Sequence, residues 1–140
     1  MGLMPSPENA AEIAAMTLPV VQQNYGVALD YSPGSLKELD TIVDDLRRDQ
    51  RFEAVQTLLF SMGCYVGEVL VRHAGARWRT TGEPGVEKTA SSPIAVEMPD
   101  GRGCNPVGRV YRRFQKGRGD SLAAFYQAMT GTLPDEKARA

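Results

Sequence analysis

One histidine and two cysteines are the side chains of this sequence best suited to nucleophilic or general-base chemistry. Because His73 is the only histidine, the sequence excludes a metal site with several histidine ligands, and any catalytic triad would have to use His73. Cys64 lies nine residues before His73, which on one helix separates the two by about 180° and ~13.5 Å. The two cannot form a nucleophile-base pair within that helix, so only Cys104 remains as a thiol partner for His73.

Glu68 lies in the most apolar segment of the chain, where a buried carboxyl group would suit general acid-base chemistry if a second carboxylate faced it. No such partner is identifiable from the sequence. Arg72 follows four residues later, and an i, i+4 ion pair explains Glu68 without any chemistry. Arg72 and His73 also suit the last turn of a helix, whose dipole favours cations. These structural interpretations are favoured, and neither a metal ion nor a cofactor is expected.

Targeting and redox features of the chain indicate the cytosol. The first basic residue is Lys37, so the N-terminus lacks the cationic region of a secretory signal. The best apolar run, residues 55–71, is interrupted by Glu68 and does not form an uncharged membrane span of about 18 residues. Cys64 and Cys104 are expected as free thiols, because a reducing compartment disfavours structural disulfides. We predict a cytoplasmic protein that engages no membrane.

Charge is distributed unevenly along the chain, although its formal net charge is only -1. Residues 102–118 include no acid and six basic residues, namely Arg102, Arg109, Arg112, Arg113, Lys116 and Arg118. Residues 30–49 carry six acids against three basic residues. On a helix that begins at Pro106, four basic side chains would lie within about 100° of one another: Arg109, Arg112, Arg113 and Lys116. The sequence therefore predicts a single basic helix face.

This basic face has three interpretations, which the sequence leaves open. It is solvated, or it pairs with the acidic segment 30–49, or it recognises a partner. An acidic protein is the favoured partner. Nucleic acid is the alternative, and its binding would depend strongly on salt.

Trp78 is the only tryptophan and lies between Arg77 and Arg79. An exposed tryptophan in this setting would fill a partner's pocket or stack on a base, so Trp78 joins the four basic residues as a candidate binding residue. A strand offers the simpler interpretation, with Trp78 and Thr80 facing inward and both arginines facing outward.

Caps and hydrophobic periodicity predict the order of the elements. The first expected helix begins at Ser6-Pro7 and restarts near Pro19. The others are a helix that begins at Ser32-Pro33, a long apolar helix over residues 52–71, a helix that begins at Asn105-Pro106, and a last helix that begins at Asp120 or Ser121. Strands are expected at residues 77–80, 94–98 and near Cys104, with a loop at 82–92. In the long helix, Gly63 and Gly67 are spaced so that another backbone can approach closely.

Four segments occur in a recognisable order: residues 63–70 (GCYVGEVL), 75–78 (GARW), 105–110 (NPVGRV) and 120–126 (DSLAAFY). In this order they resemble a group of small, uncharacterised bacterial proteins, over about residues 27–130. The resemblance implies a compact α+β domain of unknown function, with a loose likeness to small immunity-type binding proteins. The group has no agreed activity, so the resemblance assigns no catalytic residue.

Together these patterns predict an α+β fold, with about five helices around a central apolar helix and a two- or three-stranded antiparallel sheet. A single domain is expected over residues 1–140, with flexible ends at 1–7 and 132–140. The favoured function is a non-enzymatic protein-binding module, immunity-like in character, that uses Trp78 and the basic face against an acidic partner. The alternatives are a nucleic-acid binder that uses the same face and a small enzyme built on Glu68, His73 or Cys104.

Overall fold

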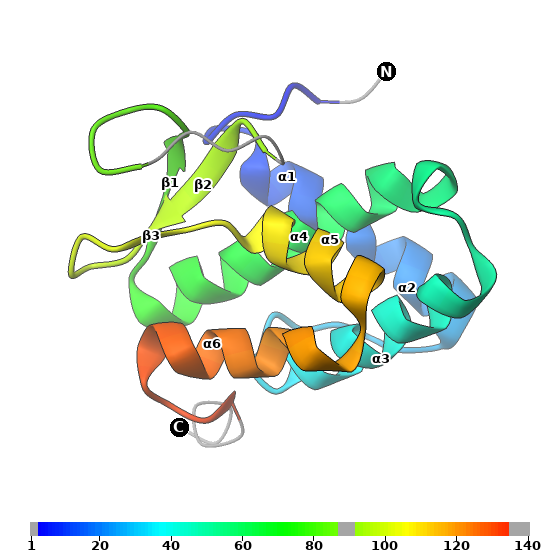
Figure 1. Ribbon diagram of the computed structural model, residues 1–140. Coiled ribbons are helices and arrows are strands. Elements are labelled where there is room, and N and C mark those ends of the chain that lie inside the picture. The colour runs from blue at the N-terminus through cyan, green and yellow to red at the C-terminus, as the bar shows by residue number, and fades with distance from the viewer. Residues whose placement is uncertain (1–2, 87–91, 135–140) are drawn as a thin grey trace.

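The structure is a computed structural model that describes residues 3–86 and 92–134 (Figure 1). Its helices are α1 (Ala10–Ala15), α2 (Thr17–Tyr25), α3 (Ser35–Asp49), α4 (Phe52–Ala74), α5 (Pro106–Lys116), the short 3₁₀ helix η1 (Arg118–Asp120) and α6 (Leu122–Thr130). Its strands are β1 (Arg77–Thr80), β2 (Ile94–Glu97) and β3 (Gly103–Cys104), which form one antiparallel sheet in the order β1-β2-β3. The predicted α+β fold is confirmed, with five other α-helices around α4 in the described residues. Parts of the predicted loop and ends, residues 1–2, 87–91 and 135–140, lie outside the described residues.

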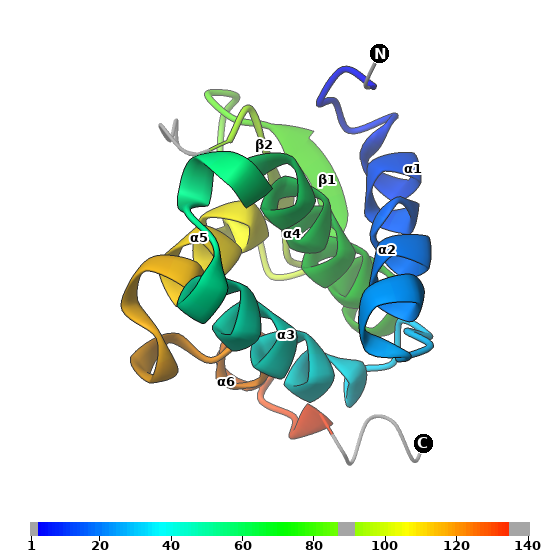
Figure 2. The same cartoon turned by 90° about the vertical axis from the view of Figure 1, so that its right-hand side faces the viewer.

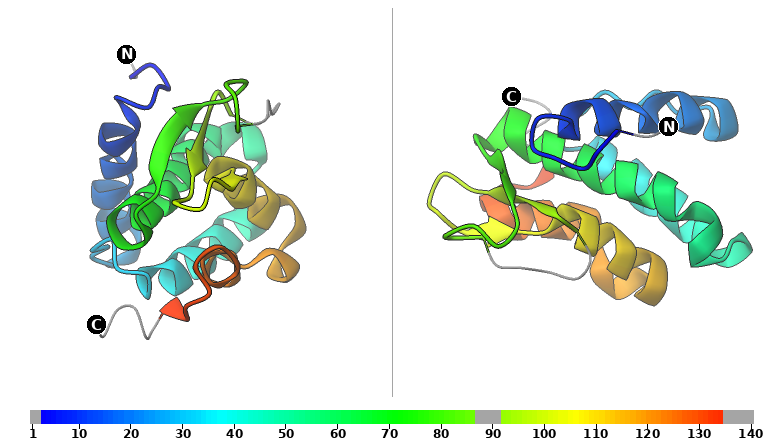
Figure 3. Two further views of the ribbon diagram at one scale, coloured as in Figure 1. Left: turned by 90° about the vertical axis from the view of Figure 1, so that its left-hand side faces the viewer. Right: turned by 90° about the horizontal axis from the view of Figure 1, so that it is seen from above.

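Helix α4 forms the centre of the molecule. All ten of its residues from Ser61 to Leu70 are buried, and α4 contacts each of the other α-helices described. Figures 2 and 3 place α1 and α2 on one side of α4 and α5 on the other. By length and composition α4 is apolar enough to cross a membrane, but 67% of its most apolar window is buried inside the protein. This burial is what the core helix of a globular domain requires.

The close approach of another backbone, predicted at Gly63 and Gly67, is confirmed at Gly63, whereas side chains occupy the space beside Gly67. A Cβ atom added at Gly63 would lie 2.5 Å from the Cα of Val107, so the start of α5 rests directly on the α4 backbone. A Cβ atom added at Gly67 would overlap the ring of Trp78 and lie 3.3 Å from Cγ of Pro106. The two glycines thus bring α5 and β1 against the same stretch of the central helix, at a cost of roughly 1 kcal/mol of helix propensity for each.

The sheet pairs Trp78 with Val96 and Arg79 with Ala95 across β1 and β2. Trp78 faces α4, whereas Arg77 and Arg79 both reach Glu97 on the other face, at 2.7 and 3.1 Å. The predicted alternation is wrong at Thr80, which is exposed. Thr80 is the last residue of a four-residue strand, and the chain leaves the sheet at that point.

The N-terminal helix begins later than predicted. Residues 6–9 form a turn in which the amide of Asn9 donates to the carbonyl and the hydroxyl oxygen of Ser6, and α1 begins only at Ala10. Ser6 therefore caps a turn rather than the helix. The predicted restart near Pro19 is confirmed, because α1 ends at Ala15 and α2 begins at Thr17, so that Pro19 falls in a first turn, where its missing N–H is tolerated.

Candidate functional site

Three basic side chains of α5 are exposed in a row: Arg109, Arg112 and Lys116, which we call the basic surface. Helix α5 turns its apolar side to α4, burying Val107, Val110 and Phe114. Asn105 fixes the start of the helix, because its side chain accepts a hydrogen bond of 3.0 Å from the amide of Gly108. Lys116 lies seven positions after Arg109 on the helix, so the basic surface extends over about 10.5 Å of the axis.

A shallow hollow of about 470 Å³ follows the basic surface. Its lining residues all belong to α5 or its cap and include no acid: Asn105, Gly108, Arg109, Tyr111, Arg112, Gln115 and Lys116. The ring of Tyr111 meets Phe52 edge-on, with centroids 5.1 Å apart, which anchors this aromatic side chain to α4. The hollow is therefore positively charged and stands on a rigid element.

The predicted basic face of four residues is wrong at Arg113. Arg113 is only 6% exposed, and its Nη2 atom lies 2.7 Å from Oδ2 of Asp44 on α3. Its Nε atom also lies 3.6 Å from Oδ1 of Asp40 on the same helix. The angle of Arg113 on the helical wheel was correct, but α3 covers that flank of α5. Arg113 therefore pairs with the acidic helix, and the other three side chains face solvent; the side chain of Arg118 lies outside the described residues.

The exposed arginines contact the segment that follows α5. Arg112 Nε lies 3.7 Å from Oδ1 of Asp120 in η1, and Cζ of Arg109 lies 5.1 Å from the ring centroid of Phe125 in α6. Among the described acids, none forms an ion pair with Arg109 or Lys116. The surface thus retains positive charge that the described part of the chain leaves uncompensated.

Arg47 is a further basic residue that the sequence did not connect with α5. It extends from α3, and its Nη2 atom donates to the carbonyl of Gln115 at 3.4 Å, near the C-terminal end of α5. Cations are favoured there because the last carbonyls of a helix carry partial negative charge. No sequence pattern predicts this contact, since Arg47 and Gln115 are 68 residues apart.

Trp78 is half-buried, and its one polar side-chain atom already forms a hydrogen bond within the protein. The indole Nε1 donates to Oε2 of Glu68 at 2.9 Å, while the ring covers Gly67. These contacts support the interpretation of Trp78 as an inward residue of β1. A binding role for Trp78 stays a prediction, and the structure gives this side chain a place in the packing between β1 and α4.

The ion pair predicted between Glu68 and Arg72 is present, at 3.6 Å. Arg72 also lies over the ring of Tyr31, with Cζ 3.6 Å from the centroid, and Tyr31 stacks on Tyr65 at 4.6 Å. Tyr31 has a positive φ of 63°, which L residues rarely adopt, and its amide donates to the hydroxyl of Tyr65 at 2.8 Å. This cluster explains Glu68 and Arg72 structurally; nothing in the sequence indicates Tyr31 as its centre.

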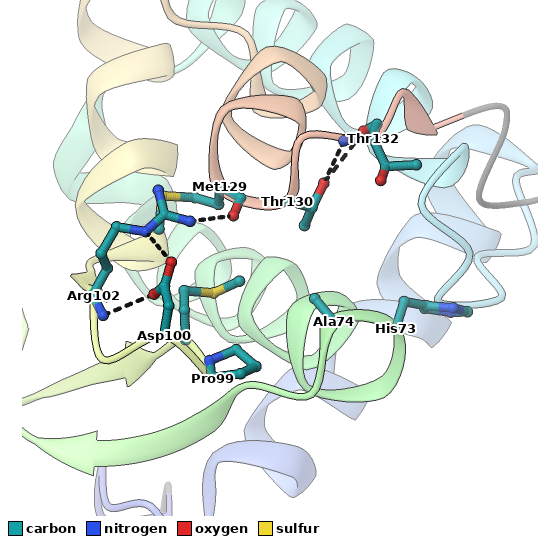
Figure 4. A pocket seen from close by; sticks show the side chains of 9 residues that line it. His73, Ala74, Pro99, Asp100, Arg102, Met129, Thr130 and Thr132 are labelled. Atoms are coloured by element: carbon teal, nitrogen blue, oxygen red, sulfur yellow. Dashed lines mark hydrogen bonds and ion pairs between the residues drawn. The ribbon is translucent and has the colours of Figure 1, made fainter.

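The thiols are poorly suited to act as nucleophiles. Burial raises the pKa of Cys64 and of Cys104 to about 12, so both are protonated at neutral pH. His73 lines a cavity of about 380 Å³ between α4, the β2–β3 turn and α6, and its ring points away from Asp100 and Arg102 (Figure 4). Neither Glu68 nor Cys104 lines that cavity. Within residues 3–86 and 92–134, His, Cys, Asp and Glu form no cluster of three or more that suits a metal ion.

Asp40 has a structural role that the sequence analysis did not predict. Its carboxylate accepts hydrogen bonds from the amides of Leu122 and Ala123, at 2.8 and 3.3 Å, and from the hydroxyl of Ser121 at 2.9 Å. It thereby stabilises the N-terminus of α6, where peptide dipoles favour negative charge. The only sequence signal was the acidic character of residues 30–49, which does not identify a target.

Comparison with known proteins supports the resemblance stated above. No curated protein and no solved structure matches the chain. A family model described only as a family of unknown function matches residues 5–118, which include α1 to α5 with the basic surface and end before α6. The chain therefore belongs to this family of unknown function, DUF6278.

Proposed function

We propose that the protein is a binding module whose basic surface receives an acidic segment of a partner protein. The observation that carries this proposal is a row of three exposed cations on one helix, two of which pair with no carboxylate of the described residues. An acidic segment would supply the missing charge, and complementary potentials favour both the encounter and the orientation of partners.

The rigidity of α5 supports this proposal. The helix lies directly on Gly63, and its buried face packs against the central helix. The backbone positions of Arg109, Arg112 and Lys116 are therefore fixed before binding. A surface of this kind loses little conformational entropy in its backbone when a partner binds, which leaves more of the electrostatic gain as affinity.

A protein partner is favoured over nucleic acid for two reasons. The whole chain has a formal charge of -1, so it lacks the long-range attraction that a strongly basic domain exerts on a polyanion. Binding of single strands also relies on aromatic platforms, whereas Tyr111, the aromatic residue of the hollow, is half-buried and holds its ring against Phe52.

The test uses a labelled octaglutamate peptide and the full chain at low salt. Replacing Arg109, Arg112 and Lys116 together with glutamine should weaken binding by about tenfold, since three exposed charge pairs contribute ~0.5 kcal/mol each. A matched control replaces three exposed basic residues elsewhere, Lys37, Arg48 and Arg51, and lowers the net charge by the same amount. Equal losses in the two triple variants would contradict the proposal.

Binding of a labelled octathymidine strand, measured in the same way, tests the alternative that the partner is a nucleic acid. We expect the peptide to bind at least as tightly as the oligonucleotide under identical salt conditions. Preferential binding of the oligonucleotide through the same three side chains would replace the proposed function with nucleic-acid binding.

A further inference from the structure

Residues 120–129, which follow α5, contact three arginines: two on α5 and one in the turn between β2 and β3. Asp120 of η1 meets Arg112, Phe125 of α6 meets Arg109, and the carbonyl of Met129 accepts a hydrogen bond of 2.8 Å from Arg102. Only the first of these contacts places a carboxylate on the basic surface. Asp120 thus occupies the kind of position that a carboxylate of an acidic partner would take.

We propose that Asp120 is an internal competitor for Arg112, which an acidic partner displaces when it binds; this inference rests on the proposed function. In the free protein the carboxylate of Asp120 covers part of the charge of Arg112. An acidic segment that reaches Arg109 and Lys116 at the same time replaces it. Asp120 therefore selects partners with several clustered carboxylates over partners with one.

The geometry of the contact permits this exchange. The distance of 3.7 Å between Arg112 Nε and Asp120 Oδ1 exceeds that of a hydrogen bond. The Arg112 side chain is 50% exposed, so a partner can reach it, while the Asp120 side chain is 19% exposed. The neighbouring contact of Arg113 with Asp44 is different, because the Arg113 side chain is only 7% exposed and the contact measures 2.7 Å, a hydrogen-bond distance. A long ion pair whose arginine is half-exposed is weak enough for a partner to displace, whereas the short pair of the buried Arg113 is part of the fold.

A double-mutant cycle on Arg112 and Asp120 tests the inference, with the labelled octaglutamate peptide as probe. Asp120→Asn should tighten binding about two- to fivefold, the range expected from removing one weak ion pair near the surface. In the background of Arg112→Gln the same replacement should have no effect, because the competitor acts only through Arg112. Thermal melts of all four proteins establish that they are folded, and Asp120→Ser repeats the cycle if the asparagine variant melts early.

The outcomes separate this inference from the proposed function. If the parent binds the peptide but Asp120→Asn binds no more tightly, Asp120 is not a competitor and the basic surface remains the binding site. If Asp120→Asn tightens binding equally with and without Arg112, the effect is general charge removal and the inference is wrong. If the parent protein does not bind the peptide in a way that depends on the three basic side chains, both proposals fall together.

Discussion

Arg112 and Arg113 are adjacent in the chain, and the structure places them in opposite environments. Arg112 is half-exposed beside Asp120, whereas Arg113 is buried between Asp40 and Asp44. One step along a helix turns a side chain by about 100°, which is enough to move it from solvent into the contact with α3. A helical wheel gives this angle but does not show which flank another helix covers.

Replacement of each arginine with glutamine should therefore have unequal effects on stability. We expect Arg113→Gln to lower the free energy of unfolding by roughly 3 kcal/mol or more, because it leaves two carboxylates near Arg113 without their buried partner. Arg112→Gln, as the matched control, should change it by less than about 1 kcal/mol. Urea unfolding measures both values. Similar losses in the two variants would contradict the assignment of Arg113 to the interior.

At the scale of elements, the spacing between α4 and α5 depends on Gly63. Alanine at this position would gain about 1 kcal/mol of helix propensity, but its methyl group would lie 2.5 Å from the Cα of Val107. Because the obstacle is backbone, α5 has to shift, and we expect a net loss of about 2 kcal/mol of stability. Gly119→Ala is the control, since nothing lies within 4 Å of its added Cβ. A Gly63→Ala protein as stable as the parent would contradict the close contact.

The attachment of α6 depends on one carboxylate of another helix. Asp40→Asn removes the charge that faces the amides of Leu122 and Ala123 and the guanidinium of Arg113. We expect the free energy of unfolding to fall by about 1–3 kcal/mol. Amide hydrogen exchange should become faster than in the parent protein, more so in α6 than in α4. Asp45→Asn serves as the control, because Asp45 pairs with the exposed Arg48 at the surface. Unchanged exchange in α6 would contradict this prediction, because it would show that the other contacts of α6 hold the helix in place without the Asp40 charge.

At the scale of the whole molecule, local signals of the sequence predicted most of the elements. The Asn105-Pro106 start of α5, the Ser121 start of α6 and the restart near Pro19 all coincide with the structure, since each depends on neighbouring residues. The candidate site was predicted only in part. The contacts of Arg47 with Gln115, of Arg113 with Asp44 and of Asp40 with α6 join residues 68 to 83 positions apart, and these depend on how helices pack rather than on any local pattern.

The thiols of the buried Cys64 and the half-buried Cys104 predict how the stability of the whole protein responds to alkaline pH. Burial raises the pKa of Cys64 and Cys104 from the usual 9.0 to about 12. Between these values the unfolded chain has lost both protons and the native protein has kept them, so the native state binds more protons and the free energy of unfolding falls as pH rises. The slope is at most about 1.4 kcal/mol per thiol for each pH unit.

Urea unfolding at pH 7 and at pH 10.5 measures this effect. The parent should lose stability between the two conditions, while the variant Cys64→Ser/Cys104→Ser, which lacks ionisable thiols, should lose clearly less. Tyr65 remains in both proteins, and its pKa, which burial raises from 10.0 to about 12, contributes the same residual slope to each. The difference between the two slopes thus isolates the thiols. Identical slopes would mean that the thiols ionise as readily in the native protein as in the unfolded chain, which is incompatible with their burial.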